Sequence, residues 1–322
     1  MGVMSRADEH LRYALGPLIL GLLEDPTVTD IHCNPPEHLG ADGTLWCERF
    51  GRPAEIVGQI DSGTAWNVVT SVAGCLGRHI NATTPFIEGE LFGDGPRFDG
   101  IIPPHVLAPA FSIRVPASQV FTLDQYVAAG LMSGRQSDRL EFAIRTRQNI
   151  VVVGSTGSGK TTLLNALIEA MARLTPDDRT AIIEDTFELQ AAMPNKLRIR
   201  TGEALSHQQA IRRVLRYTPR RIVVGEVRGG EAWQMLKLWN TGHPGGVTSF
   251  HSDIARPHDA LRRVEQMIAE VIEVPQPAVI ADTIHLIVCL ERDSTGRRRV
   301  AQIASVQGWD STRREYSISP EV

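Results

Sequence analysis

The 322-residue sequence has few cysteines and lacks a long apolar run. Its four cysteines, Cys33, Cys47, Cys75 and Cys289, form no CxxC pair and have no histidine partner at zinc-finger spacing. Neither a structural zinc site nor a disulfide framework is therefore indicated, and a reducing cytoplasm fits best. The N-terminal apolar stretch from Leu15 to Leu23 is too short to span a bilayer and fits part of an amphipathic helix instead. We expect no signal peptide and no transmembrane helix.

Basic residues are fewer than acidic ones, and most of the basic residues are arginines. The 33 lysines and arginines are outnumbered by 37 aspartates and glutamates, which gives a net charge of −4 at pH 7. No overall basic field attracts nucleic acid, so DNA is disfavoured as the main ligand, although a local basic patch is left open. The only lysines are Lys160, Lys196 and Lys237, so a lysine inside a phosphate-binding motif is easy to identify.

The first part of the chain alternates short apolar runs with turn-forming clusters such as Asn34-Pro35-Pro36. This pattern predicts an α+β domain with several hairpins over residues 1–115. Residues 116–134 combine a short helical pattern with flanking proline and glycine, and we place the linker between domains there.

From residue 149 onward, apolar runs rich in β-branched residues alternate with helical stretches. The apolar runs are Ile150–Val153, Ala181–Ile183, Ile222–Val224, Val247–Phe250 and Ile284–Leu290, and the helical stretches are 160–174, 206–216, 229–240 and 257–272. Buried parallel strands joined by crossover helices have this pattern, which predicts a doubly wound α/β domain over residues 135–322. We expect the chain to close with a hairpin around Asp293–Gly296.

The first of these strands runs directly into a phosphate-binding motif. Gly154-Ser155-Thr156-Gly157-Ser158-Gly159-Lys160-Thr161 matches G-x-x-x-x-G-K-[ST] between a strand and a helix, where the motif must lie. Its glycines let successive backbone N–H groups surround a phosphate, and the helix directs its positive end at the same anion. Lys160 is expected to reach the β- and γ-phosphates of ATP and Thr161 to bind Mg²⁺. Thr162 completes the predicted nucleotide site.

Hydrolysis needs acidic groups at the ends of neighbouring strands, and two predicted strands end in such groups. Glu184 and Asp185 follow the strand at 181–183, and Glu226 has a Walker B position after the strand at 222–224. Either strand end can instead carry a helix cap or a surface charge.

Two histidines flank the predicted strand at 247–250. A lone histidine is more often structural than catalytic, but His243 and His251 both lie beside a P-loop sheet. We interpret them as sensors that hydrogen-bond the γ-phosphate or the attacking water.

These motifs, in this order, resemble those of the secretion ATPase superfamily, which serves type II secretion, type IV pili and type IV secretion. The Ile183–Thr186 segment with Glu188 resembles its Asp box, residues 221–230 (RIVVGEVRGG) its Walker B segment, and residues 239–246 (WNTGHPGG) with His251 its His box. The absent cysteine-pair zinc module argues against the type II branch. WNTGHPGG is most similar to the type IV conjugation branch.

The resemblance implies a C-terminal RecA-like P-loop ATPase domain, with nucleotide bound between it and the N-terminal α+β domain. It implies that Arg97 and Arg114 add positive charge that stabilises phosphoryl transfer, although both could be ordinary surface ion pairs. It places Glu226 near the Mg²⁺-bound water and makes Glu184 the candidate base, without apportioning the two roles. Arg220 departs from the family pattern, because relatives often have an acidic residue there.

For the whole protein, the resemblance implies a homohexameric ring on the cytoplasmic face of the inner membrane. There it would associate peripherally with the inner-membrane subunits of type IV secretion and mating-pair formation. It would act in pilus assembly and in substrate transfer. Two alternative functions stay open. A DNA-stimulated RecA-like motor of the helicase type could use basic runs such as Arg297–Arg299, although such runs are usually solvated. A nucleotide-gated scaffold would bind ATP without turning it over.

Overall fold

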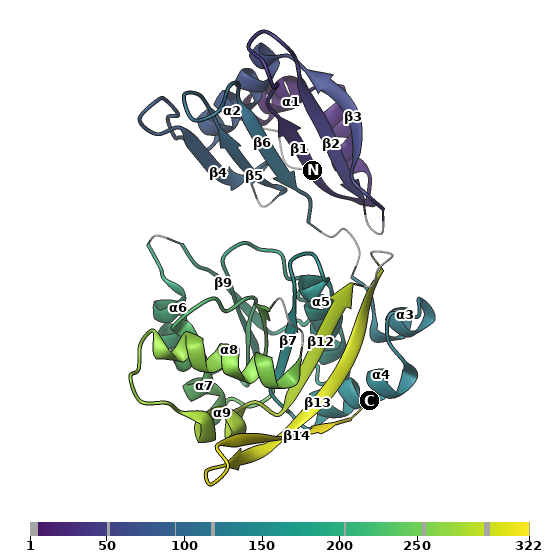
Figure 1. The fold of residues 1–322 in the computed structure, drawn as a ribbon, viewed down its shortest axis with the longest axis vertical. Helices are drawn as coiled ribbons and strands as arrows, with labels where there is room; N and C mark the ends of the chain where they lie inside the picture. The colour runs from purple at the N-terminus through teal and green to yellow at the C-terminus, as the bar shows by residue number, and fades with distance from the viewer. Residues whose placement is uncertain are drawn as a thin grey trace. The chain divides into compact units, whose positions relative to one another are not determined.

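The structure, a computed structural model, describes residues 6–49, 52–93, 95–116, 120–202, 204–252, 256–292 and 297–321. The chain consists of two compact units, Met1–Gln119 and Val120–Val322, each with its own β-sheet (Figure 1). Within the described ranges, no helix is both long and apolar enough to cross a membrane.

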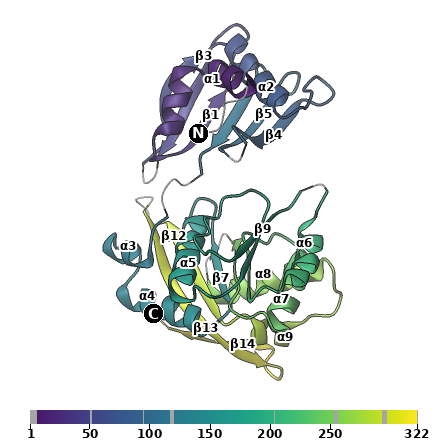
Figure 2. The same ribbon diagram turned by 180° about the vertical axis from the view of Figure 1, so that it is seen from behind.

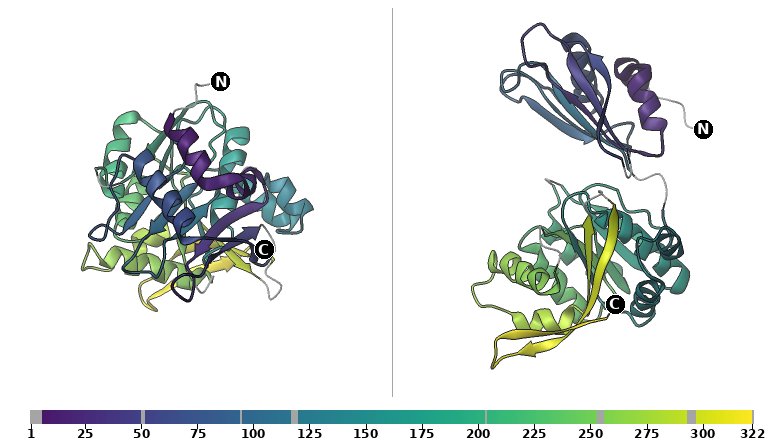
Figure 3. Two further views of the ribbon diagram at one scale, coloured as in Figure 1. Left: turned by 90° about the horizontal axis from the view of Figure 1, so that it is seen from above. Right: turned by 45° about the vertical axis from the view of Figure 1, so that its right-hand side comes forward.

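The N-terminal unit is a six-stranded antiparallel sheet with two helices on one face (Figure 3). Its elements are α1 (Arg6–Glu24), β1 (Val28–Asn34), β2 (Gly43–Arg49), β3 (Glu55–Ile60), α2 (Ser62–Cys75), β4 (Phe86–Glu90), β5 (Arg97–Ile101) and β6 (Ala110–Arg114). The strand order is β3-β2-β1-β6-β5-β4. Alternate strand residues such as Ile31, Phe98 and Ile113 are buried against the helices, as expected for a sheet with one solvated face. The apolar stretch at 15–23 lies in α1, which is broken at Gly16, where φ is 70°.

The second unit is built on an eight-stranded sheet of order β14-β13-β12-β7-β11-β10-β8-β9. Its strands are β7 (Ile150–Gly154), β8 (Thr180–Glu184), β9 (Lys196–Arg200), β10 (Arg221–Val224), β11 (Val247–His251), β12 (Leu286–Arg292), β13 (Arg298–Asp310) and β14 (Glu315–Pro320). The six strands from β12 to β9 in this order are parallel, and β13 and β14 add antiparallel strands at one edge.

Helices cover both faces of this sheet (Figures 1 and 2). They are α3 (Leu123–Ala128), α4 (Gly134–Arg145), α5 (Lys160–Leu174), α6 (His207–Val214), α7 (Glu231–Asn240), α8 (Pro257–Ala269) and α9 (Pro277–Thr283), with a 3₁₀ helix, η1 (Leu215–Tyr217). Val151 and Val153 of β7 pack with α6 to α9, whereas Ile150 and Val152 pack with α3 to α5. A strand buried on both faces reads as a continuous apolar run, which is why β7 was recognisable in the sequence.

The fold class predicted from the sequence is confirmed, with a mixed N-terminal unit and a doubly wound C-terminal one. The edge strand β9 was not predicted. Residues 120–134 of the predicted linker belong to the second unit, where Leu123 and Met132 are buried in its core. Residues 117–119 of that linker and the hairpin turn at 293–296 lie outside the described residues.

Buried polar side chains hold the amino ends of the parallel strands. The guanidinium of Arg221 is fully buried, and its Nε donates to Oδ2 of Asp178 at 2.7 Å. Its Nη1 donates to the carbonyl of Gly245 at 3.2 Å. Oδ1 of Asn149 accepts hydrogen bonds from the backbone N–H groups of Gly245 and Gly246 at 2.8 and 3.0 Å. These contacts tie the starts of β7, β10 and β11 together.

Candidate functional site

The P-loop is the turn between β7 and α5. Gly157 and Gly159 have φ of 70° and 95°, which lets the loop reverse direction at no steric cost. A Cβ atom at Gly154 would lie 2.5 Å from Oγ of Ser158, so the loop closes only over a glycine there. No side chain caps the helix that begins at Lys160. Its first N–H groups are therefore available to an anion.

The ammonium group of Lys160 lies over this loop. Its Nζ donates to the carbonyl oxygens of Gly154 and Ser155, both at 3.0 Å. Burial lowers the pKa of Lys160, and the negative charge of Glu226 partly opposes that shift. The P-loop and Glu226 follow β7 and β10, which run parallel on either side of β11, so both lie at the carboxyl edge of the sheet. Thr161 is exposed on the first turn of α5.

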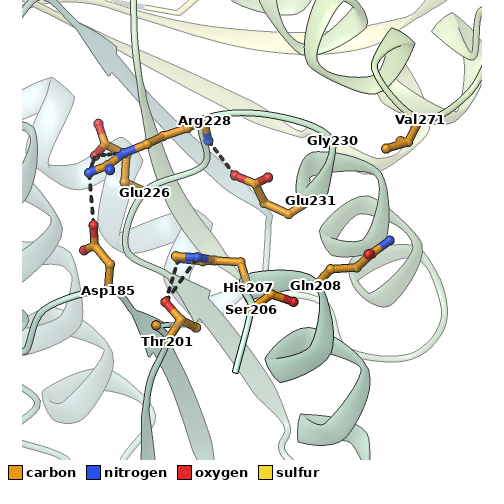
Figure 4. Close-up of a pocket in the computed structure, with 11 residues that line it drawn as sticks. Asp185, Thr201, Ser206, His207, Gln208, Glu226, Arg228, Gly230, Glu231 and Val271 are labelled. Atoms are coloured by element: carbon orange, nitrogen blue, oxygen red, sulfur yellow. Dashed lines mark hydrogen bonds and ion pairs between the residues drawn. The ribbon is translucent and has the colours of Figure 1, made fainter. Parts of the chain in front are cut away.

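Arg228 joins the acids that follow β10 and β8 (Figure 4). Its Nε and Nη2 atoms lie 2.9 and 2.7 Å from Oε2 of Glu226, and Nη2 lies 3.1 Å from Oδ2 of Asp185. These residues line a pocket of about 550 Å³, together with Thr201 and His207, whose side chains approach to 3.1 Å. Asp185, one of the strand-end acids named from the sequence, contacts the same guanidinium as Glu226.

Glu184 is buried, and both of its carboxylate oxygens are engaged. Oε1 accepts two hydrogen bonds from Arg198, at 2.7 and 3.1 Å, and Oε2 accepts one from the backbone N–H of Leu189 at 2.9 Å. Burial raises the pKa of Glu184, and the hydrogen bond from Arg198 opposes that shift. The guanidinium of Arg198 also lies 4.3 Å from the ring centroid of Phe187. Glu184 thus anchors β9 and the loop after β8.

The two predicted histidines lie at opposite ends of the parallel strands, His243 at the amino ends and His251 at the carboxyl ends. His251 ends β11 beside Gly154 in the register, and its Nδ1 lies 3.4 Å from Oγ1 of Thr156 in the P-loop. His243 precedes β11, where its Nδ1 donates to the carbonyl oxygen of Pro219 at 2.8 Å. The length of β11 alone separates these ends by about 13 Å. Of the two histidines, His251 is the one beside the P-loop in this chain.

Arg97 and Arg114 are neighbours in the N-terminal unit. Arg97 begins β5 and Arg114 ends β6, and the two residues are directly opposed in the antiparallel register. Nε of Arg114 donates to Oδ1 of Asp30 at 2.9 Å, while 60% of the Arg114 side chain is exposed. Phe98 and Ile113, the adjacent residues, point to the core, so both arginines project from the opposite face. Their role in phosphoryl transfer stays a prediction.

The P-loop residues fit the phosphates of a nucleotide. Oγ of Ser158 is buried without a hydrogen-bond partner among the described residues, and such groups normally have one. Thr161 and Glu226 offer a hydroxyl and a carboxylate, which together with phosphate oxygens are the ligands that Mg²⁺ uses in such sites. In the described ranges, no group of three His, Cys, Asp or Glu side chains could hold a metal ion by itself.

Two arginines beside the site were not assigned to it from the sequence. Arg228 lies in the Walker B segment, and its position two residues after Glu226 was the available signal. Arg292 ends β12, and its Nε donates to the carbonyl oxygen of Gly157 at 2.9 Å. Nothing local in the sequence connects Arg292 to the P-loop, since the contact depends on β12 pairing with β7.

Comparison with known proteins finds a matching family and relatives that are similar over most of the chain. The family model described as "Type II/IV secretion system protein" matches residues 100–314. The chain is 42% identical over 310 residues to a probable conjugal transfer protein TrbB of Sinorhizobium fredii, covering 96% of this chain and 93% of the relative. It is also 42% identical to the conjugal transfer protein TrbB of Rhizobium radiobacter, covering 94% and 91%.

A solved structure supports the fold independently of close sequence identity. The Legionella pneumophila ATPase DotB matches with a TM-score of 0.61 at 19% identity, covering 87% of this chain and 77% of that one. At this identity the likeness concerns the fold alone. Together with the family match over residues 100–314, it confirms the resemblance stated from the motifs. The chain belongs to the type II/IV secretion system protein family, the secretion ATPases.

Proposed function

We propose that the protein is a Mg²⁺-dependent ATPase that powers conjugative type IV secretion. The observation that carries this proposal is that the P-loop with Lys160 follows β7 and Glu226 follows β10, two parallel strands of one sheet, so both lie at its carboxyl edge. Phosphoryl transfer from ATP requires backbone donors for the phosphates, a cation beside them and a carboxylate for metal and water. The P-loop, Lys160 and Glu226 supply these three parts.

Each part has a defined task in hydrolysis. The P-loop N–H groups and Lys160 hold the β- and γ-phosphates. When the nucleotide binds, these phosphates replace the carbonyls of Gly154 and Ser155 as partners of Lys160, because a hydrogen bond between two charged groups is stronger than one to a neutral carbonyl. Thr161 and Glu226 would hold Mg²⁺, which would supply positive charge against the charge that develops on the phosphates. Glu226 orients the attacking water, and His251 senses the γ-phosphate through its place beside the loop. Glu184 is the weaker candidate base, because both of its oxygens are already engaged.

The proposed setting is a homohexameric ring at the cytoplasmic face of the inner membrane. There the protein associates peripherally with other subunits of a type IV secretion system. Support comes from two relatives that are named conjugal transfer proteins and match at 42% identity over nearly the whole of both chains.

Steady-state ATPase activity of the wild type and of Glu226→Gln tests the proposal. We expect Mg²⁺-dependent turnover by a hexamer, unaffected by single-stranded DNA. The variant should lose about 10²–10³-fold in turnover while still binding ATP, because a neutral amide neither holds Mg²⁺ nor orients water as well. The assay is run with and without Mg²⁺ and DNA, and native mass counts the protomers.

Glu291→Gln is the matched control for that experiment. Glu291 is also near a strand end and paired with an arginine, Arg299, but it lies on β12. Its variant should keep turnover within about twofold of the wild type. Strong stimulation by DNA would support the nucleic-acid motor, and a wild type without turnover would support the scaffold. Normal hydrolysis by Glu226→Gln would leave that acid with a structural role only.

Arg97→Ala and Arg114→Ala test the predicted contribution of the N-terminal unit. Each should lower turnover much more than nucleotide affinity, because charge that stabilises the transition state affects kcat first. Arg52→Ala, an exposed arginine of the same unit, should change neither. Equal losses of turnover and affinity would mean that the two arginines are plain binding contacts.

A further inference from the structure

The hairpin of β12 and β13 places two arginines against the P-loop. Arg292 ends β12, Arg298 begins β13, and the two are directly opposed in the register. Nε of Arg292 donates to the carbonyl oxygen of Gly157 at 2.9 Å. A Cβ atom at Gly159 would lie 3.4 Å from Cδ of Arg298. Each arginine therefore lies against one of the two P-loop glycines that have positive φ.

This arrangement concentrates positive charge beside the phosphate site. Arg292 is exposed, and among the described residues it makes no ion pair. Its hydrogen bond to Gly157 uses one of the five N–H donors of the guanidinium. Like charges directly opposed across an antiparallel pair destabilise that pair, so an anion placed beside Arg292 and Arg298 would relieve their repulsion.

The sheet order indicates which part of a nucleotide these arginines meet. β12 adjoins one side of β7, whereas β11 and β10 lie on the other side. His251 and Glu226 come from β11 and β10, so the terminal phosphate and Mg²⁺ of the proposed function belong on their side. The arginines from β12 and β13 therefore face the part of the nucleotide that ATP and ADP share.

We propose that Arg292 and Arg298 form a second cationic wall of the nucleotide site, opposite the acids, that binds ATP and ADP alike. The orientation of the nucleotide in this inference rests on the proposed function. Contacts made equally in the ground state and the transition state lower KM and leave kcat unchanged. The arginines of the hairpin thus set nucleotide affinity, while Glu226 acts in hydrolysis.

Titration of ADP into Arg292→Gln and Arg298→Gln, with KM and kcat for ATP, tests this wall. Arg292→Gln should weaken ADP binding and raise KM by about tenfold, the size expected for one charged hydrogen bond. Its kcat should stay within about twofold of the wild type. Arg298→Gln should shift ADP affinity in the same direction. Arg292→Lys should recover part of the loss, because it keeps the charge but not the planar fork.

Arg299→Gln is the control on the same hairpin. Arg299 follows Arg298 on β13 and pairs with Glu291 instead of approaching the P-loop, so its variant should bind ADP like the wild type. Wild-type ADP affinity in Arg292→Gln would overturn the inference, as would an equal loss in Arg299→Gln. A fall in kcat at unchanged KM would also overturn it. ADP titration needs no turnover. A wild type that binds ADP without hydrolysing ATP would refute the proposed function but not the proposed role of Arg292 and Arg298 in nucleotide binding.

Discussion

Replacing Lys160 with alanine is expected to reduce ATP turnover on the order of 10³-fold while the fold survives. The β- and γ-phosphates would lose the one cation that the P-loop itself provides. Alanine is a strong helix former, so the start of α5 should persist. The two loop carbonyls that Lys160 now contacts can be hydrated in the variant. Steady-state ATPase activity and far-ultraviolet circular dichroism measure the two effects.

Lys196→Ala provides a control with the same chemistry at another place. Nζ of Lys196 also donates to two backbone carbonyls, those of Ala191 and Met193, but at the far edge of the sheet in β9. Its variant should turn ATP over at nearly the wild-type rate. Retained turnover in Lys160→Ala would refute the assignment of the nucleotide site, and so would an equal loss in Lys196→Ala.

Arg221→Met is expected to lower the free energy of unfolding of the second unit by about 3–5 kcal/mol, because it leaves a buried carboxylate without its main partner. The side chain of Arg221 is fully buried, and Asp178 is 3% exposed. Urea denaturation followed by circular dichroism measures the change. Arg212→Met, on the exposed face of α6, is the matched control and should cost less than about 0.5 kcal/mol.

The double variant Asp178→Asn, Arg221→Met separates a lost ion pair from a packing defect. Removing both charges should cost less than the sum of the single losses, since no uncompensated charge is left; strict additivity would contradict the ion-pair account. Burial by itself would raise the pKa of Asp178, but Arg221 and Arg147 lower it below 3.8. The stabilisation is therefore fully present above about pH 4 and is lost as the pH falls through the lowered pKa.

The sequence predicted the parts of the fold that local pattern controls. The central strands of the second unit are buried on both faces, so they appear as apolar runs, and the crossover helices between them follow from strand spacing. β9 has the composition KLRIR and only one face packed on the core, which leaves no apolar run to recognise. Strand order in the N-terminal unit depends on long-range pairing, and turn signals do not encode it.

The site was predicted to the extent that its residues follow strand ends. The P-loop and Glu226 lie at one edge of the sheet because the strands that they follow are parallel. By the same reasoning, His243 lies away from the P-loop, because it precedes β11 whereas the P-loop follows β7. The pairing of Arg228 with Asp185 and the contact of Arg292 with Gly157 needed the structure, since they join segments that no motif connects.

The edge strand β9 has a consequence for self-association of the sheet. A strand at an edge presents unpaired N–H and C=O groups that can recruit a strand from another chain into an aggregate. Lys196, Arg198 and Arg200 alternate along β9, so a second copy of β9 docking there would meet like charge. Arg198, which binds Glu184, therefore also helps to prevent another chain from adding a strand to the sheet. A β9 whose charges were neutralised would be a starting point for fibrils.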